Sequence, residues 1–331
     1  MTAARAAQPA WERLPAVERG AYLRKIAQGI RGRADELTDT IVAEGGKTKD
    51  LARVEVMFTA DYLDYQAEWA RRYEGEIIQS DRPRENILSF KRPLGVIAGI
   101  LPRNFPFFLI ARKMGPDLVT GNTIVVKPSS VTPINCHIFA EIIDAVGLPA
   151  GMFNVVDGPG AEIGNALSAH PQVDMVSLTG SVEAGRQVME AASANITKVS
   201  LELGGKRTEG RGYFFEPTLL TDTDNSMDIM KEETFGLVLP VSAFDTLDQV
   251  IALANDCEFG LTSSVYTTNL NEAFYVTRRL QFGETYINRE NFEAMQGFHA
   301  GWEKSGIGGA DGKHGLEEYL QTQVIYLETD I

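Results

Sequence analysis

The sequence predicts an α/β fold: a doubly wound parallel sheet, followed by a second and smaller α/β part. Three observations predict it. Apolar runs of strand length alternate with amphipathic segments of helix length from residue 94 to residue 201. The links between them are short, which is typical of right-handed strand–helix–strand crossovers. Residues 173–206 form one complete unit of this kind, in which a Gly turn joins an apolar run to a helix.

Helices are expected before the sheet. Apolar residues step by three or four positions across residues 23–41, and two glycines end the run. The same spacing continues across residues 51–69. Residues 76–93 change character, because prolines bracket a short alternating segment, and this predicts either a hairpin or an exposed strand.

The alternating part of the chain supplies the sheet. The expected strands are 94–101, 123–126, 153–156, 173–178 and 196–201, and the expected helices are 107–118, 134–146, 161–167 and 184–192. Ligands of doubly wound sheets bind beyond the carboxyl ends of the strands. The side chains expected at that edge are an amide, an ammonium group, a hydroxyl and a carboxylate, from Asn104, Lys127, Ser181 and Glu202. Their convergence favours a nucleotide site.

The Gly turn alone is weaker evidence for such a site. Gly180 and Gly185 do not have the GxGxxG spacing of a dinucleotide fingerprint, and a strand-to-helix turn without a ligand is equally typical. The turn does place Ser181 at a helix N-terminus, whose backbone N–H groups can bind a phosphate.

Composition excludes several classes of protein. With 331 residues and 44% apolar content, the chain has room for about two domains and a large core. A net charge of −14 argues against nucleic acid and anionic membranes as partners. No apolar run reaches the ~20 residues of a membrane span, and no secretory leader is recognisable. The two cysteines form no disulfide framework, and the four histidines lack zinc-ligand spacing. We therefore expect a cytoplasmic protein without a metal site.

The second part of the chain is expected to be shorter and more loop-rich. The expected strands are 214–220, 238–244, 262–266, 284–288 and 322–327, with helices at 247–255 and 270–280 and a loop-rich segment at 306–315.

Several motifs, taken in order, resemble the NAD(P)-dependent aldehyde dehydrogenase superfamily, and within it the lactaldehyde and glycolaldehyde dehydrogenases. The motifs are PRNFPFFLIARKM, VVKPSSVTP, GLPAGMFNVV, SLTGSVEAG, LELGGK, KEETFGLVLPV and ETYINRENFEAMQGFHAG. The resemblance implies a helical N-terminal part and a Rossmann-type cofactor domain over residues 1–206, with a hairpin at about 76–93. It further implies a shortened catalytic domain over 207–316 and an oligomerisation strand over 317–331, which in relatives adds to a partner subunit's sheet.

Two large pieces of the family pattern are missing. The N-terminal strands that usually precede the first helix of relatives are not found, and a block further along the chain is lost. LELGGK continues directly from Lys206 into Arg207, where relatives have on the order of 100 further residues that normally carry the catalytic cysteine. Neither Cys136, in an expected helix, nor Cys257, in a helix-to-strand loop, matches the context of that cysteine. Nothing beside either residue would lower the pKa of its thiol, so both are expected to be structural.

The resemblance implies catalytic roles for two residues. Glu202 corresponds to the general base that activates water for thioester hydrolysis. Asn104 corresponds to the asparagine that stabilises the oxyanion formed on the aldehyde. Arg103 stands where the family usually has tryptophan, and Asn104 could also be a simple turn residue.

The resemblance also implies a cofactor site. Lys127 would hydrogen-bond the adenosine ribose, and Gly180 and Ser181 would lie at the pyrophosphate. Ser130 stands where the family often has glutamate. A serine there removes both a ribose acceptor and a repulsion against a 2′-phosphate, so we expect NAD, with NADP possible.

Four further residues complete the implied site. Glu233 and Phe235 resemble the pair that holds the nicotinamide ribose and packs near the ring, although an acidic pair on a loop can also be merely solvated. Arg112 and His299 are the polar residues expected to face a small hydroxyaldehyde, and either can equally be structural.

Two functions remain open. The first is NAD(P)-dependent oxidation of a small hydroxyaldehyde, such as lactaldehyde, to its acid by a homo-oligomer. The second is that of a catalytically inactive remnant that binds nucleotide or associates with intact relatives. The direct junction at Lys206–Arg207 also predicts that apolar runs at 238–241 and 263–266 lack partners and that the part after Arg207 is loosely packed.

Overall fold

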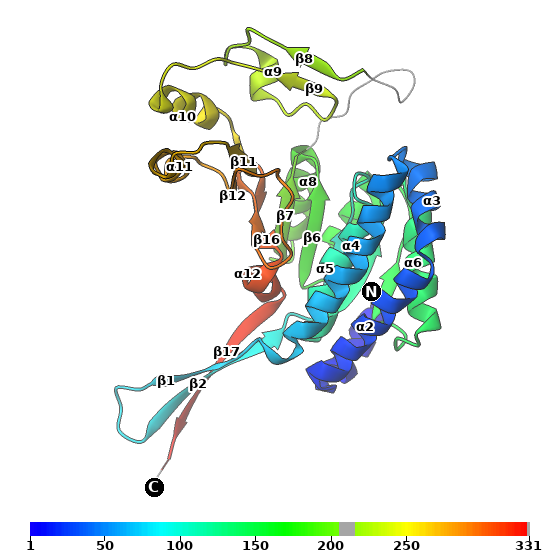
Figure 1. Cartoon of the computed structure of the whole chain (residues 1–331). Helices are drawn as coiled ribbons and strands as arrows, with labels where there is room; N and C mark the ends of the chain where they lie inside the picture. Colours follow the sequence, from blue (N-terminus) through cyan, green and yellow to red (C-terminus); the bar gives the residue numbers. More distant parts are fainter. Residues whose placement is uncertain (205–215, 330–331) are drawn as a thin grey trace.

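The computed structural model describes residues 1–204 and 216–329 of the chain (Figure 1). Its first part is helical: α1 (Thr2–Arg13), α2 (Ala16–Gly32), α3 (Ala34–Gly45) and α4 (Lys49–Glu68), followed by the short η1 (Trp69–Arg71). The run at 23–41, predicted as one helix, is divided between α2 and α3. The division falls at Arg33, whose φ of −112° and ψ of 20° leave the helical region.

A six-stranded sheet follows. Its members are β3 (Val96–Ile100), β4 (Thr123–Lys127), β5 (Phe153–Val155), β6 (Met175–Gly180), β7 (Lys198–Leu203) and β15 (Gly306–Ile307), in the order β15-β7-β6-β3-β4-β5. All neighbours are parallel except β15, which is antiparallel to β7. The chain proceeds outward from β3 through β4 to β5, and on the other side through β6 to β7. This reversal confirms the predicted doubly wound α/β fold and marks the usual ligand-binding edge.

Helices cover both faces of this sheet. They are α5 (Phe108–Thr120) and α6 (Ile134–Ala145) on one face, and α7 (Asn165–Ser168) and α8 (Val182–Ser193) on the other. The strands are buried on both sides, so alternate residues enter different cores: Ile97 packs with the first set and Val96 with the second. The helix expected at 161–167 is instead a π-helical turn, η2 (Gly160–Gly164), followed by the short α7.

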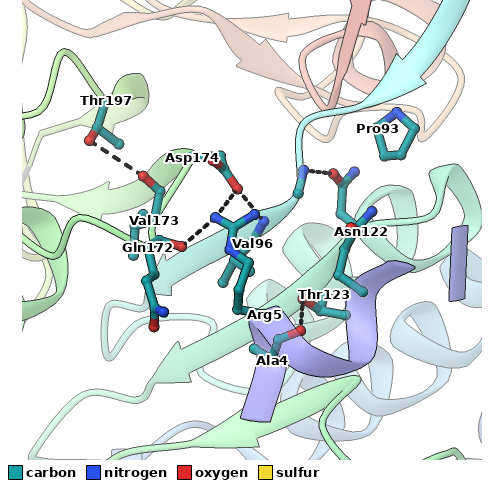
Figure 2. Close-up of polar contacts among 12 residues, drawn as sticks. Ala4, Arg5, Pro93, Val96, Asn122, Thr123, Gln172, Val173, Asp174 and Thr197 are labelled. Carbon is teal, nitrogen blue, oxygen red and sulfur yellow. Dashed lines mark hydrogen bonds and ion pairs between the residues drawn. The ribbon is translucent and has the colours of Figure 1, made fainter. Parts of the chain in front are cut away.

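The first helix is anchored to the amino end of the sheet. Arg5 donates to Asp174 Oδ2 at 2.6 Å, and the same oxygen accepts the backbone N–H of Val96 at 2.7 Å (Figure 2). Gly95 has a φ of +134°, and a Cβ there would lie 2.1 Å from Asp174 Oδ2. A side chain at this position would therefore break the anchor.

The predicted hairpin is present. It consists of β1 (Glu76–Gln79) and β2 (Glu85–Pro93), and β17 (Leu320–Glu328) pairs antiparallel with β2 to give a three-stranded sheet that projects from the rest of the chain (Figure 1). The final strand expected at 322–327 is thus confirmed and is longer than predicted.

The remaining elements form small, separate sheets. The strands are β8 (Thr218–Leu220), β9 (Val238–Pro240), β10 (Phe259–Gly260), β11 (Thr262–Val265), β12 (Glu284–Ile287), β13 (His299–Ala300), β14 (Trp302–Glu303) and β16 (Gly309–Ala310), and the helices are α9 (Asp228–Lys231), α10 (Leu247–Asn255), α11 (Leu270–Thr277) and α12 (Gly312–Glu317). Two pairs, β8–β9 and β11–β12, are parallel. The strand expected at 238–244 ends at Pro240. The Lys206–Arg207 junction and the start of the strand expected at 214–220 lie outside the described residues.

Candidate active site

Four of the sequence-predicted polar residues follow or end neighbouring strands of the six-stranded sheet. Asn104 lies in the loop after β3, Lys127 ends β4, Ser181 follows β6, and Glu202 is the penultimate residue of β7. These strands are parallel and adjacent, so their carboxyl ends share one edge. The sheet therefore places all four at the edge that the sequence predicted.

Glu202 supplies a carboxylate to this edge, from β7. Its side chain is 11% exposed, accepts a hydrogen bond from Thr179 Oγ1 at 3.0 Å and lies 3.8 Å from Arg112 Nη1. Burial raises the pKa of Glu202, but Arg112, Lys113 and His299 outweigh burial and bring the pKa to about 2. Glu202 is therefore an anion at neutral pH.

Arg112 holds a group of carboxylates together. It projects from α5, is 4% exposed, and makes a two-pronged contact with Asp311 through Nε and Nη2. Its Nη1 lies 3.5 Å from Glu293 as well as near Glu202. Burial raises the pKa of Asp311 even though Arg112 opposes that shift. The buried guanidinium thus compensates the charges of three largely buried carboxyl groups.

Two more basic side chains border Glu202. Lys113 is 2% exposed and donates to Ser177 Oγ at 2.9 Å, and burial lowers its pKa to about 8. His299 Nδ1 lies 2.7 Å from Glu284 Oε2. Burial lowers the pKa of His299, but the hydrogen bond to Glu284 leads the effects that bring it above the ordinary value. The second part of the chain therefore supplies polar groups to the same site.

A buried carboxylate on α4 fixes the loop that carries Asn104 through backbone hydrogen bonds. Glu55, 1% exposed on α4, accepts the backbone N–H groups of Phe107 and Phe108 at 2.9 and 3.1 Å, at the start of α5. Lys47 pairs with the other oxygen of Glu55 and lies over the ring of Phe105. Among the described residues, Asn104 Oδ1 is buried and has no hydrogen-bond partner. The loop is fixed while its amide keeps unused hydrogen-bonding capacity.

The expected cofactor residues line the neighbouring part of the edge. Lys127 is 3% exposed and donates to the carbonyl of Pro128 at 2.9 Å; burial lowers its pKa. Ser130 is exposed and donates to the carbonyl of Gly158. Ser181 caps α8 by accepting the N–H of Ala184 at 3.2 Å. The cap fixes the start of a twelve-residue helix directly after Gly180.

The structure also brings Glu233 to this edge. A Cβ built on Gly204, just after β7, would lie 2.8 Å from Glu233 Oε2, so the two residues are in close approach. Burial raises the pKa of Glu233. Phe235 follows in the same loop and is 42% exposed. The loop thus lies against the strand that carries Glu202.

The cysteines lie elsewhere. Cys136 is fully buried in α6, and burial raises the pKa of its thiol to about 12. Cys257 follows α10, with its sulfur 3.9 Å from the carbonyl oxygen of Lys231. In the described part of the chain, neither thiol contacts Glu202 or its partners, and no group of three His, Cys, Asp or Glu side chains is placed to hold a metal ion. Within the same residues, no helix is long and apolar enough to cross a membrane.

Comparison with known proteins identifies the family of the chain. A family model described as "Aldehyde dehydrogenase family" matches residues 1–209 and 206–325. The chain belongs to the aldehyde dehydrogenase family. It is thus grouped with oxidoreductases that act on aldehydes, and the resemblance seen in the motifs is confirmed.

Four of the matches illustrate the membership. Escherichia coli lactaldehyde dehydrogenase is 51% identical over 428 residues, covering 99% of this chain and 89% of the relative. A solved lactaldehyde dehydrogenase superposes with a TM-score of 0.97, covering 99% of this chain and 90% of that one. A solved 3,6-anhydro-L-galactose dehydrogenase in complex with NAP is 33% identical and superposes with a TM-score of 0.94, covering 99% of this chain and 90% of that one. Staphylococcus aureus betaine aldehyde dehydrogenase in complex with NAD⁺ is 28% identical and superposes with a TM-score of 0.95, covering 100% of this chain and 86% of that one.

Sequence reasoning missed several members of this aldehyde dehydrogenase site. Lys113, Glu284 and Asp311 were not singled out, although all three bear on Arg112, His299 or Glu202. One signal was available: an Arg-Lys pair inside an otherwise apolar helix must find buried acids or hydroxyls. The sequence does not say which distant carboxylates those are.

Proposed function

We propose that this site serves the NAD(P)-dependent oxidation of a small hydroxyaldehyde, of the lactaldehyde or glycolaldehyde type, to its carboxylic acid. One observation carries the proposal: an ionised, nearly buried Glu202 lies at the sheet edge that also holds Asn104, Lys127 and Ser181. The 51% identity to lactaldehyde dehydrogenase supports the substrate class.

The residues at the edge fit a nicotinamide nucleotide. Gly180 has no side chain at the strand-to-helix turn, and the capped start of α8 presents backbone N–H groups suited to a pyrophosphate. Lys127 would hold the adenosine ribose, and Glu233 and Phe235 the nicotinamide end. The bound nucleotide would supply a hydride acceptor. The exposed Ser130 offers no charge against a 2′-phosphate, so the proposal is NAD, with NADP possible.

The protein groups have separate tasks in this proposal. Asn104 would donate to the developing oxyanion of the aldehyde. Glu202, an anion at neutral pH, would accept a proton from water. Arg112 and His299, both largely enclosed, would orient a hydroxyl group of the substrate.

A second candidate is nucleotide binding without turnover by the isolated chain. The positions of Cys136 and Cys257 favour it, because one thiol is buried with a raised pKa and the other lies after α10. Covalent capture of an aldehyde needs a thiolate beside the oxyanion donor and the base. On this candidate, the chain retains the cofactor half of the reaction only.

One assay separates the two candidates. Purified chain is incubated with lactaldehyde and NAD⁺ or NADP⁺, and absorbance of the reduced nucleotide is followed. A steady rate that Glu202→Gln abolishes supports oxidation, and its loss in Cys136→Ala or Cys257→Ala identifies the thiol. No rate, with nucleotide binding retained, supports the second candidate.

Assembly and location complete the proposal. We infer a homo-oligomer from β17, which pairs with β2 and leaves its other edge at the border of a projecting sheet. We infer a cytoplasmic location because both cysteines are free thiols, as is usual in a reducing compartment.

A further inference from the structure

Residues 216–292 carry an extensive exposed apolar surface, called here the β8–β12 face. Large apolar side chains at least 37% exposed gather on its strands, helices and loops: Leu219, Leu220, Leu237, Leu239, Val241 and Phe244 around β8 and β9, and Tyr266, Leu270, Phe274 and Ile287 around β11, α11 and β12. Where exposed apolar side chains form a contiguous patch, they mark interaction sites in soluble proteins.

This part of the chain has little core of its own. Between residues 216 and 292, the buried apolar side chains of the described structure are Ile251, Ala273 and Val276. Neither of the two large core clusters draws a buried member from that range. Figure 1 shows β8, β9, α10 and α11 set apart from the layered helices and the main sheet. The face is therefore apolar and contributes little to the core, although Glu284 and Phe292 contact other parts of the chain.

The backbone of the face is equally incomplete. The pairs β8–β9 and β11–β12 are each a parallel sheet of only two strands within the described residues. Parallel sheets are otherwise larger and covered on both faces, because their crossover helices pack on them. A hollow of about 470 Å³ lies just beyond β11 and β12, lined in part by Tyr266, Leu270, Ala273 and Ile287. Open strand edges and a hollow together suit an added α/β segment.

The comparisons indicate what that segment is. The alignment with E. coli lactaldehyde dehydrogenase is 428 residues long, whereas this chain has 331, so the relative has close to a hundred residues without a counterpart here. The family model matches in two pieces that meet at residues 206–209. β8, the first strand of the face, begins at Thr218, shortly after that break.

We propose that the β8–β12 face binds, in trans, a separate polypeptide equivalent to this central block of the aldehyde dehydrogenases. Such a partner would add strands to the open edges of β8–β9 and β11–β12, as in other cases of strand addition, and would bury the apolar side chains. A second copy of this chain is a poorer occupant. It would bring the same incomplete pairs, and each copy carries a net charge of −14.

The partner in the test is the central block of E. coli lactaldehyde dehydrogenase that has no counterpart here, expressed as a separate fluorescently labelled polypeptide. The full-length chain is titrated into it, and fluorescence anisotropy gives Kd. Leu239→Asp, at a side chain 63% exposed on β9, is expected to weaken binding at least about tenfold, since it puts a charge into the contact. Ile196→Asp is the matched control, because Ile196 is 94% exposed after α8, and it is expected to leave Kd within about twofold.

Hydrogen exchange supplies a second readout. Binding is expected to slow exchange in β8, β9, β11 and β12 and to leave β3 and β4 unchanged, which also shows whether each variant is folded. Absence of binding by a folded chain would overturn the proposal. Equal weakening by both variants, or a dimer of this chain that Leu239→Asp alone dissociates, would also overturn it. None of these outcomes bears on nucleotide binding, which is measured separately.

Discussion

Replacing Arg112 with methionine tests whether the carboxylates of the site depend on one buried cation. Arg112 is paired on two prongs with Asp311 and lies within 3.8 Å of both Glu202 and Glu293. Removing one partner of a buried ion pair costs about 3–5 kcal/mol, because the other charge is left uncompensated. Methionine keeps much of the side-chain volume, so a cavity accounts for little of this expected loss.

The loss should depend on pH. Burial already raises the pKa of Asp311, and without Arg112 it rises further. A carboxyl group whose pKa is raised in the folded state does not lower the free energy of unfolding at a pH below its unfolded pKa of ~3.9. Above that pH, the free energy of unfolding falls by ~1.4 kcal/mol for each pH unit until the folded pKa is reached. Glu202 adds to the loss, because its pKa of about 2 depends partly on Arg112, but this part changes mainly below pH 4 and persists at that pH. The variant is therefore less destabilised near pH 4 than near pH 7, where it is about 4 kcal/mol less stable than wild type.

Urea denaturation followed by tryptophan fluorescence measures this difference, with Trp11 in the main core as a reporter. Arg103→Met, at an exposed arginine before α5, is the control and should change stability by no more than about 0.5 kcal/mol at either pH. Adding Asp311→Asn to Arg112→Met should restore part of the loss at pH 7. A destabilisation of equal size at pH 4 and pH 7, or no recovery in the double variant, would refute the reasoning.

Three further predictions concern other parts of the chain. Gly95→Ala should destabilise the chain by about 1–2 kcal/mol more than Gly147→Ala in thermal melts. Both glycines have positive φ, but only Gly95 faces Asp174 and Arg5. Equal effects of the two substitutions would show that the anchor of α1 is unimportant. The stability of the wild-type chain should rise between about pH 8 and pH 10, since the lowered pKa of Lys113 makes the folded state prefer the neutral amine. Lys113→Met should remove this rise, and an unchanged pH profile in the variant would contradict that pKa. Ser130→Glu should weaken NADP⁺ binding about tenfold by calorimetry and leave NAD⁺ binding little changed, because it adds a negative charge near the 2′-phosphate. Equal changes in the affinities for the two nucleotides would exclude the proposed position of the ribose.

The doubly wound sheet could be predicted from local signals. Its strands are buried on both faces, so they read as continuous apolar runs, and α5, α6 and α8 show helical spacing. The break between α2 and α3 was not predictable, because the apolar spacing continues across Arg33 while the backbone does not. The short β15 was missed for a different reason. Its place beside β7 depends on a contact between distant segments, in which Gly306 lies opposite Glu202.

The site was predictable to the extent that strand ends define an edge. Asn104, Lys127 and Glu202 could be placed there because each follows or ends a strand of one parallel sheet. Asp311 and Glu284 could not, since they come from the second part of the chain and reach the site through tertiary packing. The apolar runs at 238–241 and 263–266 were expected to lack partners, but they pair with β8 and β12. Leu239 and Tyr266 in these runs are nevertheless 63% and 67% exposed.

The central claim is that the edge formed by β3, β4, β6 and β7 is a nicotinamide nucleotide site, and a thermal-melt series with NAD⁺ and NADP⁺ tests it most directly. A ligand that binds only the folded state adds ~2.7 kcal/mol of stability at a hundredfold excess over Kd. We predict a concentration-dependent rise in melting temperature with at least one of the two nucleotides. Lys127→Met, which removes the proposed ribose donor, should reduce that rise. No shift with either nucleotide at millimolar concentration would contradict the account.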